Sequence, residues 1–442
     1  MKLFRDIIQL QPIKHVLPLA TSAVREASNK EEFLRDANQE TGFKFKVLSE
    51  KEEALYSYAG AIKSLQLPNV LFFDLGGGSL EMVRAEKYKI KKIISLPLGA
   101  LRLTQSYDEK DGAFSPKNYK NMKRHIWNLL PSRKELDLNQ DTMFVGVGGS
   151  LRAIARYHQK IGKYPLDKIH NYEMNYKSVK EIARKLSKMR ADDIDKISVI
   201  GSSRTETIVA GSCVINTVME KLELKQVCVS NHGLREGALS IFLENEKAFH
   251  GSITVEQIRQ SVVAKEARMI TNGEDFVKGL LTSKLISKRE YIILLYALKK
   301  ISEKASYNNP LSWFYSVLDQ DMILSHSEQL VLGLSLVHAR HAKTSEWLFT
   351  RYKSILTPQD KASIKKISSV VTLLKVLTQI KAKIELRRVE DEKIELNIIP
   401  ETILPKALLQ NMLKDFQASF DINITCLIRS NLEKSEDSIL RL

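Results

Sequence analysis

The stretch that decides the fold is Val70-Leu71-Phe72-Phe73-Asp74-Leu75-Gly76-Gly77-Gly78-Ser79-Leu80-Glu81-Met82-Val83. Its first part is a short and mostly apolar run, which predicts a strand buried on both faces. Three glycines and a serine follow, and they let the backbone turn tightly without a Cβ in the way of an approaching group. Alternation resumes at Glu81, so the stretch predicts a strand, a loop whose N–H groups can hold a phosphate, and a second strand. Asp74, at the end of the first strand, is placed to hold a Mg²⁺ ion that bridges phosphate oxygens.

A plain glycine-rich hairpin is the alternative for this turn. Three consecutive glycines cost backbone entropy and add no packing, which makes a purely structural role a poor explanation. Two further glycine turns follow predicted strands, at Gly146–Ser150 and at Ser230–Gly237. Turns at the carboxyl ends of strands in an open α/β sheet converge on one cleft, so we expect the three turns to line a single site.

The composition limits the possible partners. The chain has 442 residues, of which 43% are hydrophobic, and a formal net charge of +16. That charge favours a polyanionic partner: a nucleic acid, an acidic membrane surface or a phosphate-rich substrate. The only support for a nucleic-acid partner is the net charge, because the sequence contains no motif that recognises nucleic-acid bases. The three cysteines lie far apart and no apolar run is long enough to span a membrane, so we expect a reduced, cytoplasmic protein.

Length and hydrophobic pattern predict four segments. Residues 1–65 mix helices and strands, with strands expected at 14–20 and 43–48 and a helix at 50–65 that Ser49 caps. Residues 66–246 carry the glycine turns and form the main α/β part. Residues 382–442 are expected to form a small α+β domain. Between them, residues 247–381 are predicted to form long amphipathic helices at 255–270, 274–281, 288–305, 325–343 and 360–380.

Six motifs, in order, resemble those of one known family. Phe73–Glu81 is similar to its second phosphate loop, and the other five are Ala20–Ala27, Val47–Ala54, Ser95–Ala100, Gly146–Ser150 and Gly233–Gly237. Together they resemble the exopolyphosphatase/guanosine pentaphosphatase (Ppx/GppA) phosphatases, of the superfamily of actin, sugar kinases and heat-shock ATPases. The resemblance implies an α/β fold of two ribonuclease-H-like halves around a cleft. It also implies a helical HD-like domain after them, followed here by the small α+β domain.

The resemblance assigns roles to the matched residues. Glu53 matches the catalytic glutamate that deprotonates the attacking water, and Arg25 matches an arginine on a phosphate group, which its planar fork suits. Asp74 and Glu81 match the carboxylates on the Mg²⁺ side. The expected phosphate-binding residues are Gly76, Gly77, Gly78, Ser79, Gly148, Gly149, Ser150 and Arg235. Two alternatives stay open: Glu52 as the base in place of Glu53, and a surface ion pair of Arg25 with Glu26 or Asp36.

The chain departs from the family pattern at several points. Leu80 replaces the usual threonine of the phosphate loop, and Asn231-His232 stand where Asp-Gly is common. No histidine is followed by aspartate, so the metal chemistry of an HD domain is not expected. His338 and His341 are expected to share a helix face without carboxylate partners. The family's first phosphate loop, D-x-G-S-N-S, is absent from the sequence, and we therefore expect a shortened form that is poorly soluble and nearly inactive.

Two functional hypotheses follow. The first is a Mg²⁺-dependent phosphoanhydride hydrolase that releases terminal phosphate from inorganic polyphosphate or guanosine pentaphosphate and acts as a homodimer. The alternative is a non-catalytic regulator that binds polyphosphate or an alarmone, and it rests on the absent first loop, Leu80 and the degenerate HD-like region. The shape of the pocket beyond the loops is not readable from sequence, so the sequence does not distinguish the two substrates.

Overall fold

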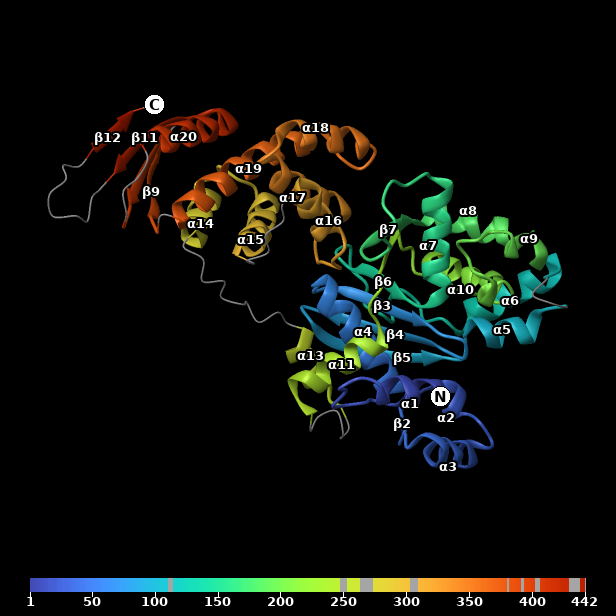
Figure 1. Cartoon of the computed structure of the whole chain (residues 1–442). Coiled ribbons are helices and arrows are strands. Elements are labelled where there is room, and N and C mark those ends of the chain that lie inside the picture. Colours follow the sequence, from blue (N-terminus) through green and yellow to red (C-terminus); the bar gives the residue numbers. More distant parts are fainter. Residues whose placement is uncertain are drawn as a thin grey trace. The chain divides into compact units, whose positions relative to one another are not determined.

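The chain divides into two compact units, Met1–Lys265 and Glu266–Leu442. The computed structural model describes residues 1–109, 114–246, 253–262, 273–302, 309–379, 381–390, 393–401, 406–428 and 438–441 (Figure 1). The four segments predicted from the sequence divide the chain more finely and stay a prediction. Helix α13 (Val255–Val262) falls in the first unit, although the predicted boundary at residue 246 had grouped it with the later helices.

A six-stranded mixed sheet is the centre of the first unit. Its strand order is β5-β4-β3-β6-β8-β7. The strands are β3 (Val70–Leu75), β4 (Leu80–Glu86), β5 (Lys89–Leu96), β6 (Met143–Val147), β7 (Tyr172–Asn175) and β8 (Gln226–Val229). β3 pairs antiparallel with β4 and parallel with β6, so the strand, loop and strand predicted for residues 70–83 are confirmed.

Helices cover both faces of this sheet (Figure 1). Leu71, Phe73 and Leu75 pack on one face, and Val70 and Phe72 on the other. The first face is covered by α5 (Ala100–Tyr107), α6 (Pro116–Leu129), α7 (Gly149–Ile161), α8 (Tyr176–Leu186) and α10 (Ile208–Lys221), and the second by α4 (Glu50–Leu65), α11 (Leu234–Glu244) and α13. Because successive side chains of a strand point to opposite faces, Asp74 of β3 lies on the α4 side.

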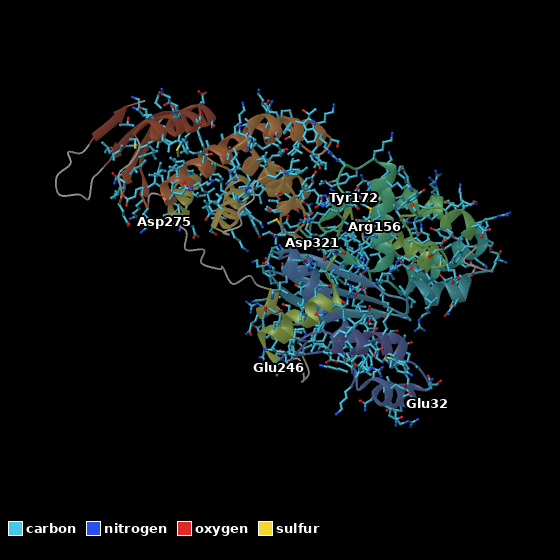
Figure 2. The ribbon with its side chains drawn as sticks, viewed as in Figure 1. Glu32, Arg156, Tyr172, Glu246, Asp275 and Asp321 are labelled. Atoms are coloured by element: carbon cyan, nitrogen blue, oxygen red, sulfur yellow. The ribbon has the colours of Figure 1, made fainter. Side chains whose placement is uncertain are left out.

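Helix α7 and strand β7 are also joined by side chains. Arg156 marks α7 and Tyr172 marks β7 in Figure 2. The hydroxyl of Tyr172 is hydrogen-bonded to Nδ1 of His158 on α7, with 2.8 Å between the atoms. Two short helical segments follow α8 in the chain, α9 (Ala191–Asp195) and the 3₁₀ turn η1 (Ser202–Arg204).

The segment before α4 is less regular than its sequence predicts. It contains α1 (Lys2–Gln9), β1 (Leu19–Ala20), α2 (Ser22–Arg25), α3 (Lys30–Thr41) and β2 (Lys46–Val47). The strands expected at 14–20 and 43–48 are therefore only two residues each. β1 and β2 pair with each other, and in the described part of the chain neither has a further neighbour, so the outer residues have no ladder to join. Ser49 caps α4, as predicted, and Glu52 completes a capping box with it.

The second unit combines a helical part with a small sheet. Its helices are α14 (Glu274–Thr282), α15 (Lys288–Ser302), α16 (Pro310–Leu318), α17 (His326–His338), α18 (Ala342–Arg351), α19 (Pro358–Gln379) and α20 (Lys406–Phe420). Its sheet has the order β12-β11-β10-β9, with β9 (Lys383–Glu390), β10 (Lys393–Ile399), β11 (Asn423–Ile428) and β12 (Ser438–Arg441). Within the described ranges, no helix is both long and apolar enough to cross a membrane.

Two sequence expectations need correction in this unit, and one helix was missed. The single helix expected over 325–343 is two helices, because the chain leaves α17 after His338 and α18 begins after His341, which is in its N-cap position. His338 and His341 therefore do not share a helix face. Helix α16 was not predicted, although Asn309 accepts a hydrogen bond from the N–H of Leu311 and Pro310 follows it, which together make a good helix start.

Candidate active site

The glycine loop between β3 and β4 is held by the start of α5. The backbone carbonyls of Gly76–Gly78 accept hydrogen bonds from the N–H groups of Gly99–Arg102, at 3.0 to 3.2 Å. In a trans peptide the carbonyl of one residue and the N–H of the next point in opposite directions, and the structure has no cis peptide among its described residues. The N–H groups of Gly77–Ser79 are therefore directed away from α5, as an anion-binding loop requires.

Gly99 makes this close approach possible. A Cβ at Gly99 would lie 2.2 Å from the carbonyl oxygen of Gly77, so any larger residue would push α5 away from the loop. Gly78 is also restricted, because its Cβ would lie 2.3 Å from Oγ of Ser22 on α2. Gly78 therefore has a packing role in addition to the conformational freedom that the sequence suggested, whereas a Cβ at Gly76 or Gly77 would meet nothing closer than 3.6 Å.

Three carboxylates meet on the α4 side of the sheet. Asp74 and Glu81 are direct partners across the β3–β4 pair, and Glu53 comes from the first turn of α4. Glu81 is only 1% exposed, and burial together with the Glu53 and Asp74 carboxylates raises its pKa to about 8. Burial also raises the pKa of Asp74 and of Glu53. Buried carboxylates that share a site ionise readily only beside a cation, and their oxygens are the ligands that Mg²⁺ prefers, so this donor set fits the ion.

Helix α4 also fixes Asp74. Oγ of Ser57, one turn after Glu53, donates a hydrogen bond to Oδ2 of Asp74 at 2.6 Å. This bond lowers the pKa of Asp74 but does not outweigh the effect of burial. The position of α4 on the sheet therefore decides where Glu53 and Asp74 stand relative to each other.

Arg25 of α2 binds Glu53. Nη1 of Arg25 lies 2.9 Å from Oε2 of Glu53 and 2.7 Å from the carbonyl oxygen of Leu48. Nη2 of Arg25 is buried and has no hydrogen-bond partner within the described residues. The alternative of a surface pair with Glu26 or Asp36 is thus replaced by a half-buried pair with Glu53, which leaves one donor for an anion.

The structure separates Glu52 from Glu53. Glu52 accepts a hydrogen bond from the backbone N–H of Ser49 at 3.0 Å and pairs with Lys46 at 3.2 Å. These contacts engage its carboxylate in the helix cap. Glu53 interacts electrostatically with Asp74, so of the two alternatives it is Glu53 that lies with the carboxylates.

Arginines gather near the start of α7. A Cβ at Gly149 would lie 1.9 Å from Cζ of Arg204, which places that guanidinium directly against the glycine. Burial and the Arg204 and Arg235 charges lower the pKa of Arg152, whereas the Asp74 carboxylate opposes them. Arg235, on the first turn of α11, is largely exposed. Arg152 and Arg204 were missed from the sequence, because neither falls in a motif position and Arg204 reaches Gly149 only through the fold.

The other predicted residues at this turn are placed differently from one another. Gly148 has φ +110, and a Cβ there would lie 2.5 Å from the carbonyl oxygen of Leu75 at the end of β3. The Ser150 side chain is buried and faces α10, where a Cβ at Gly211 would lie 2.4 Å from Ser150 Oγ. Ser150 can therefore meet a ligand only through its backbone N–H at the start of α7. The phosphate-binding roles of Gly148, Gly149, Ser150 and Arg235 stay predictions.

Known proteins resemble the first unit. The curated relatives include a bifunctional 3-dehydroquinate synthase/phosphatase of Fusobacterium nucleatum, 28% identical over 56% of this chain and 38% of the relative. They also include a guanosine-5'-triphosphate,3'-diphosphate pyrophosphatase of Vibrio vulnificus, 26% identical over 54% of this chain and 46% of the relative. Exopolyphosphatase 1 of Mycobacterium bovis is 26% identical over 56% of this chain and 73% of the relative. The matched region thus spans less than half of the first two relatives.

A solved structure shows the fold. The exopolyphosphatase of Cytophaga hutchinsonii superposes with a TM-score of 0.52 at 22% identity, over 57% of this chain and 80% of its own. The mixed sheet with helices on both faces therefore shares the fold of that exopolyphosphatase. The model of the Ppx/GppA phosphatase family matches residues 1–246, more than half of the sequence. The chain therefore belongs to the Ppx/GppA phosphatase family.

Proposed function

We propose that the first unit is a Mg²⁺-dependent phosphoanhydride hydrolase that removes the terminal phosphate of inorganic polyphosphate or guanosine pentaphosphate. The observation that carries the proposal is the placement of three carboxylates, one buried (Glu81) and two partly buried (Asp74 and Glu53), on β4, β3 and α4 at the loop whose N–H groups turn away from α5. Relatives named as an exopolyphosphatase and as a guanosine pentaphosphate pyrophosphatase support this substrate class.

Glu53 is the proposed general base. Burial raises the pKa of Glu53 toward neutral pH, and a carboxylate with a higher pKa is a more effective proton acceptor. Arg25 holds Oε2 of Glu53, so the other oxygen is available to a water molecule, while the unpaired Nη2 can bind an oxygen of the terminal phosphate. The proton of the attacking water passes to Glu53 as the new P–O bond forms and the phosphoanhydride oxygen leaves with the shortened chain.

The loop and the carboxylates stabilise the charge of the transferred group. The N–H groups of Gly77–Ser79 are donors fixed before the reaction, so they need no reorganisation as charge moves onto the phosphate oxygens. Asp74 and Glu81 would hold Mg²⁺, which neutralises charge on phosphate oxygens. Arg152, Arg204 and Arg235 form a cationic cluster suited to the phosphates further along the substrate.

The adjacent glutamates provide the test. Glu53→Gln keeps the shape but removes the base, so phosphate release should fall by roughly 10²–10⁴-fold with little change in ligand binding. Glu52→Gln is the matched control, because Glu52 is engaged in the helix cap and in the pair with Lys46, so its loss should leave turnover near-parental. Release from polyphosphate and from guanosine pentaphosphate is measured with and without Mg²⁺, beside filter binding of each ligand. Loss of activity in Glu52→Gln but not in Glu53→Gln would refute the assignment. Tight binding without release by the parental chain would favour the regulator.

A further inference from the structure

The second unit contains a cavity of about 490 Å³ that the proposed hydrolysis does not use. Its walls come from α15, α16, α17 and α19. Most of the wall is apolar, formed by Ile301, Trp313, Leu336, Ala339, Val371 and Val376. A volume of this size is typical of sites for small organic molecules.

Two cations stand at this cavity, and none of its described lining residues is a carboxylate. Lys375 of α19 and Arg340, which follows α17, both line it. The guanidinium of Arg340 lies over the indole of Trp313, with 5.1 Å from Cζ to the ring centroid. That contact fixes the direction of the guanidinium at the cavity.

Lys375 is held in an unfavourable place for a cation. Burial and the Arg340 charge lower the pKa of Lys375. Among the described residues, no hydrogen bond or ion pair to its ammonium group is found. An ammonium group beside an apolar wall and a second cation gains interaction energy when an anion binds to it, and the apolar wall favours a ligand with an apolar body.

We propose that this cavity binds an amphipathic anion, a small molecule with one carboxylate, phosphate or sulfonate group on an apolar or aromatic body. The anionic group contacts Lys375 and Arg340, and the body lies against Ile301, Val371 and Val376. Thr372 and Gln379 also line the cavity and can donate hydrogen bonds to the same anionic group. The inference rests on this unit alone and does not depend on the hydrolytic function.

The first test uses 8-anilinonaphthalene-1-sulfonate, an aromatic sulfonate whose fluorescence rises in an apolar site. Excitation of Trp313 should sensitise the bound probe, because the indole lines the cavity. Trp313→Phe should remove most of this transfer. Trp347→Phe should not, because Trp347 is 55% exposed on α18 and does not line the cavity. Equal transfer in both variants would overturn the site.

Charge variants test the anionic contact. Lys375→Gln and Arg340→Gln should each weaken probe affinity roughly tenfold, the effect of losing one charged hydrogen bond. Two controls are matched to them: Lys366→Gln on the same helix, and Arg351→Gln, whose guanidinium lies over Trp347 as that of Arg340 lies over Trp313. Unchanged affinity in both cavity variants, or equal loss in the controls, would refute the contact.

Competition separates the ligand classes. Decanoate and 1-naphthyl phosphate each combine an anion with an apolar body, so at least one should displace the probe at micromolar to millimolar concentration. Preference for decanoate would indicate an acyl ligand, and preference for 1-naphthyl phosphate an aromatic phosphate. Displacement by inorganic phosphate alone would reduce the site to a simple anion site, and equal displacement by decanol would reduce it to an apolar patch. Either of the last two results would overturn the proposal.

Discussion

Replacing Gly237 by alanine should damage catalysis more than stability. Gly237 lies on α11 against α4, and a Cβ there would be 1.9 Å from the carbonyl oxygen of Tyr56. Ordinary contact begins at about 3.4 Å, so the two helices would have to separate by about 1.5 Å, the difference between these distances. The Cβ would also lie 2.8 Å from the backbone N of Gly60. Both obstacles are backbone atoms of α4, which cannot rotate away as a side chain could.

The size of the effect follows from what α4 carries. Glu53 and Ser57 lie on α4, and a shift of about 1 Å in a reacting group costs roughly 10²-fold in turnover. Overpacking costs about 1–3 kcal/mol, and alanine in a helix recovers about 1 kcal/mol relative to glycine, so stability should fall by at most about 2 kcal/mol. We therefore expect kcat to fall about 100-fold in a protein that stays folded.

The assay pairs phosphate release with urea unfolding followed by circular dichroism. Gly279→Ala on α14 is the control, because its Cβ would meet only the Leu386 side chain, at 3.3 Å, in the unit that carries no proposed catalytic residue. That variant should keep parental turnover and lose little stability. Parental kcat in Gly237→Ala would refute the idea that the contact between α4 and α11 positions the base.

Two other outcomes are expected. Arg204→Gln should raise KM for polyphosphate roughly tenfold with kcat nearly unchanged, because one charged donor is lost. Arg124→Gln on α6 is the control. A fall in kcat without a rise in KM would contradict this role of Arg204. Asp360→Asn should destabilise the second unit by about 1–3 kcal/mol near neutral pH, since Asp360 accepts hydrogen bonds from Thr357 and pairs with Arg289 at 2.6 Å. Burial acts to raise the pKa of Asp360, but those bonds outweigh it and the pKa is lowered, so this stability is present above the unfolded value of 3.8 and is lost as pH falls through the folded one. Urea unfolding near pH 7 and about pH 3 should show the two proteins converging in acid, and a constant difference would contradict the pairing.

Features fixed by local chemistry could be predicted from the sequence. The turn at Gly76–Ser79 needs only its glycines and the flanking apolar runs, and the capping box of Ser49 and Glu52 is complete within four residues. The strands at 14–20 and 43–48 were predicted too long because strand length depends on a neighbouring ladder. The sequence pattern of one strand does not contain that neighbour.

Features fixed by distant contacts could not be predicted. Gly233–Gly237 was identified as a family motif, yet the reason for Gly237 is the approach of α4, because a Cβ there would lie 1.9 Å from the Tyr56 carbonyl oxygen. A Cβ at Gly233 would make only ordinary contacts, from 3.7 Å. Glu52 and Glu53 are adjacent in sequence and both stand on the first turn of a helix, so residue type cannot separate them. A helix turns by about 100° per residue, and this rotation sends one into the cap and the other toward Asp74.

The charges of the first unit explain why substrate and metal would act together. Burial raises the pKa of Glu53, Asp74 and Glu81, and the Glu53 and Asp74 charges add to this effect at Glu81, so the three carboxylates favour a cation among them. Arg152, Arg204 and Arg235 lie together and the last two lower the pKa of the first, so this group favours an anion. Free Mg²⁺ would compensate only the negative charge of the carboxylates. A phosphate chain without Mg²⁺ would compensate only the positive charge of the arginines, and the carboxylates would repel it. Under the proposed function, a polyphosphate chain that carries Mg²⁺ at its terminal phosphate would compensate both groups of charges. It would also bring the bond to be broken beside the loop and Glu53, the proposed base.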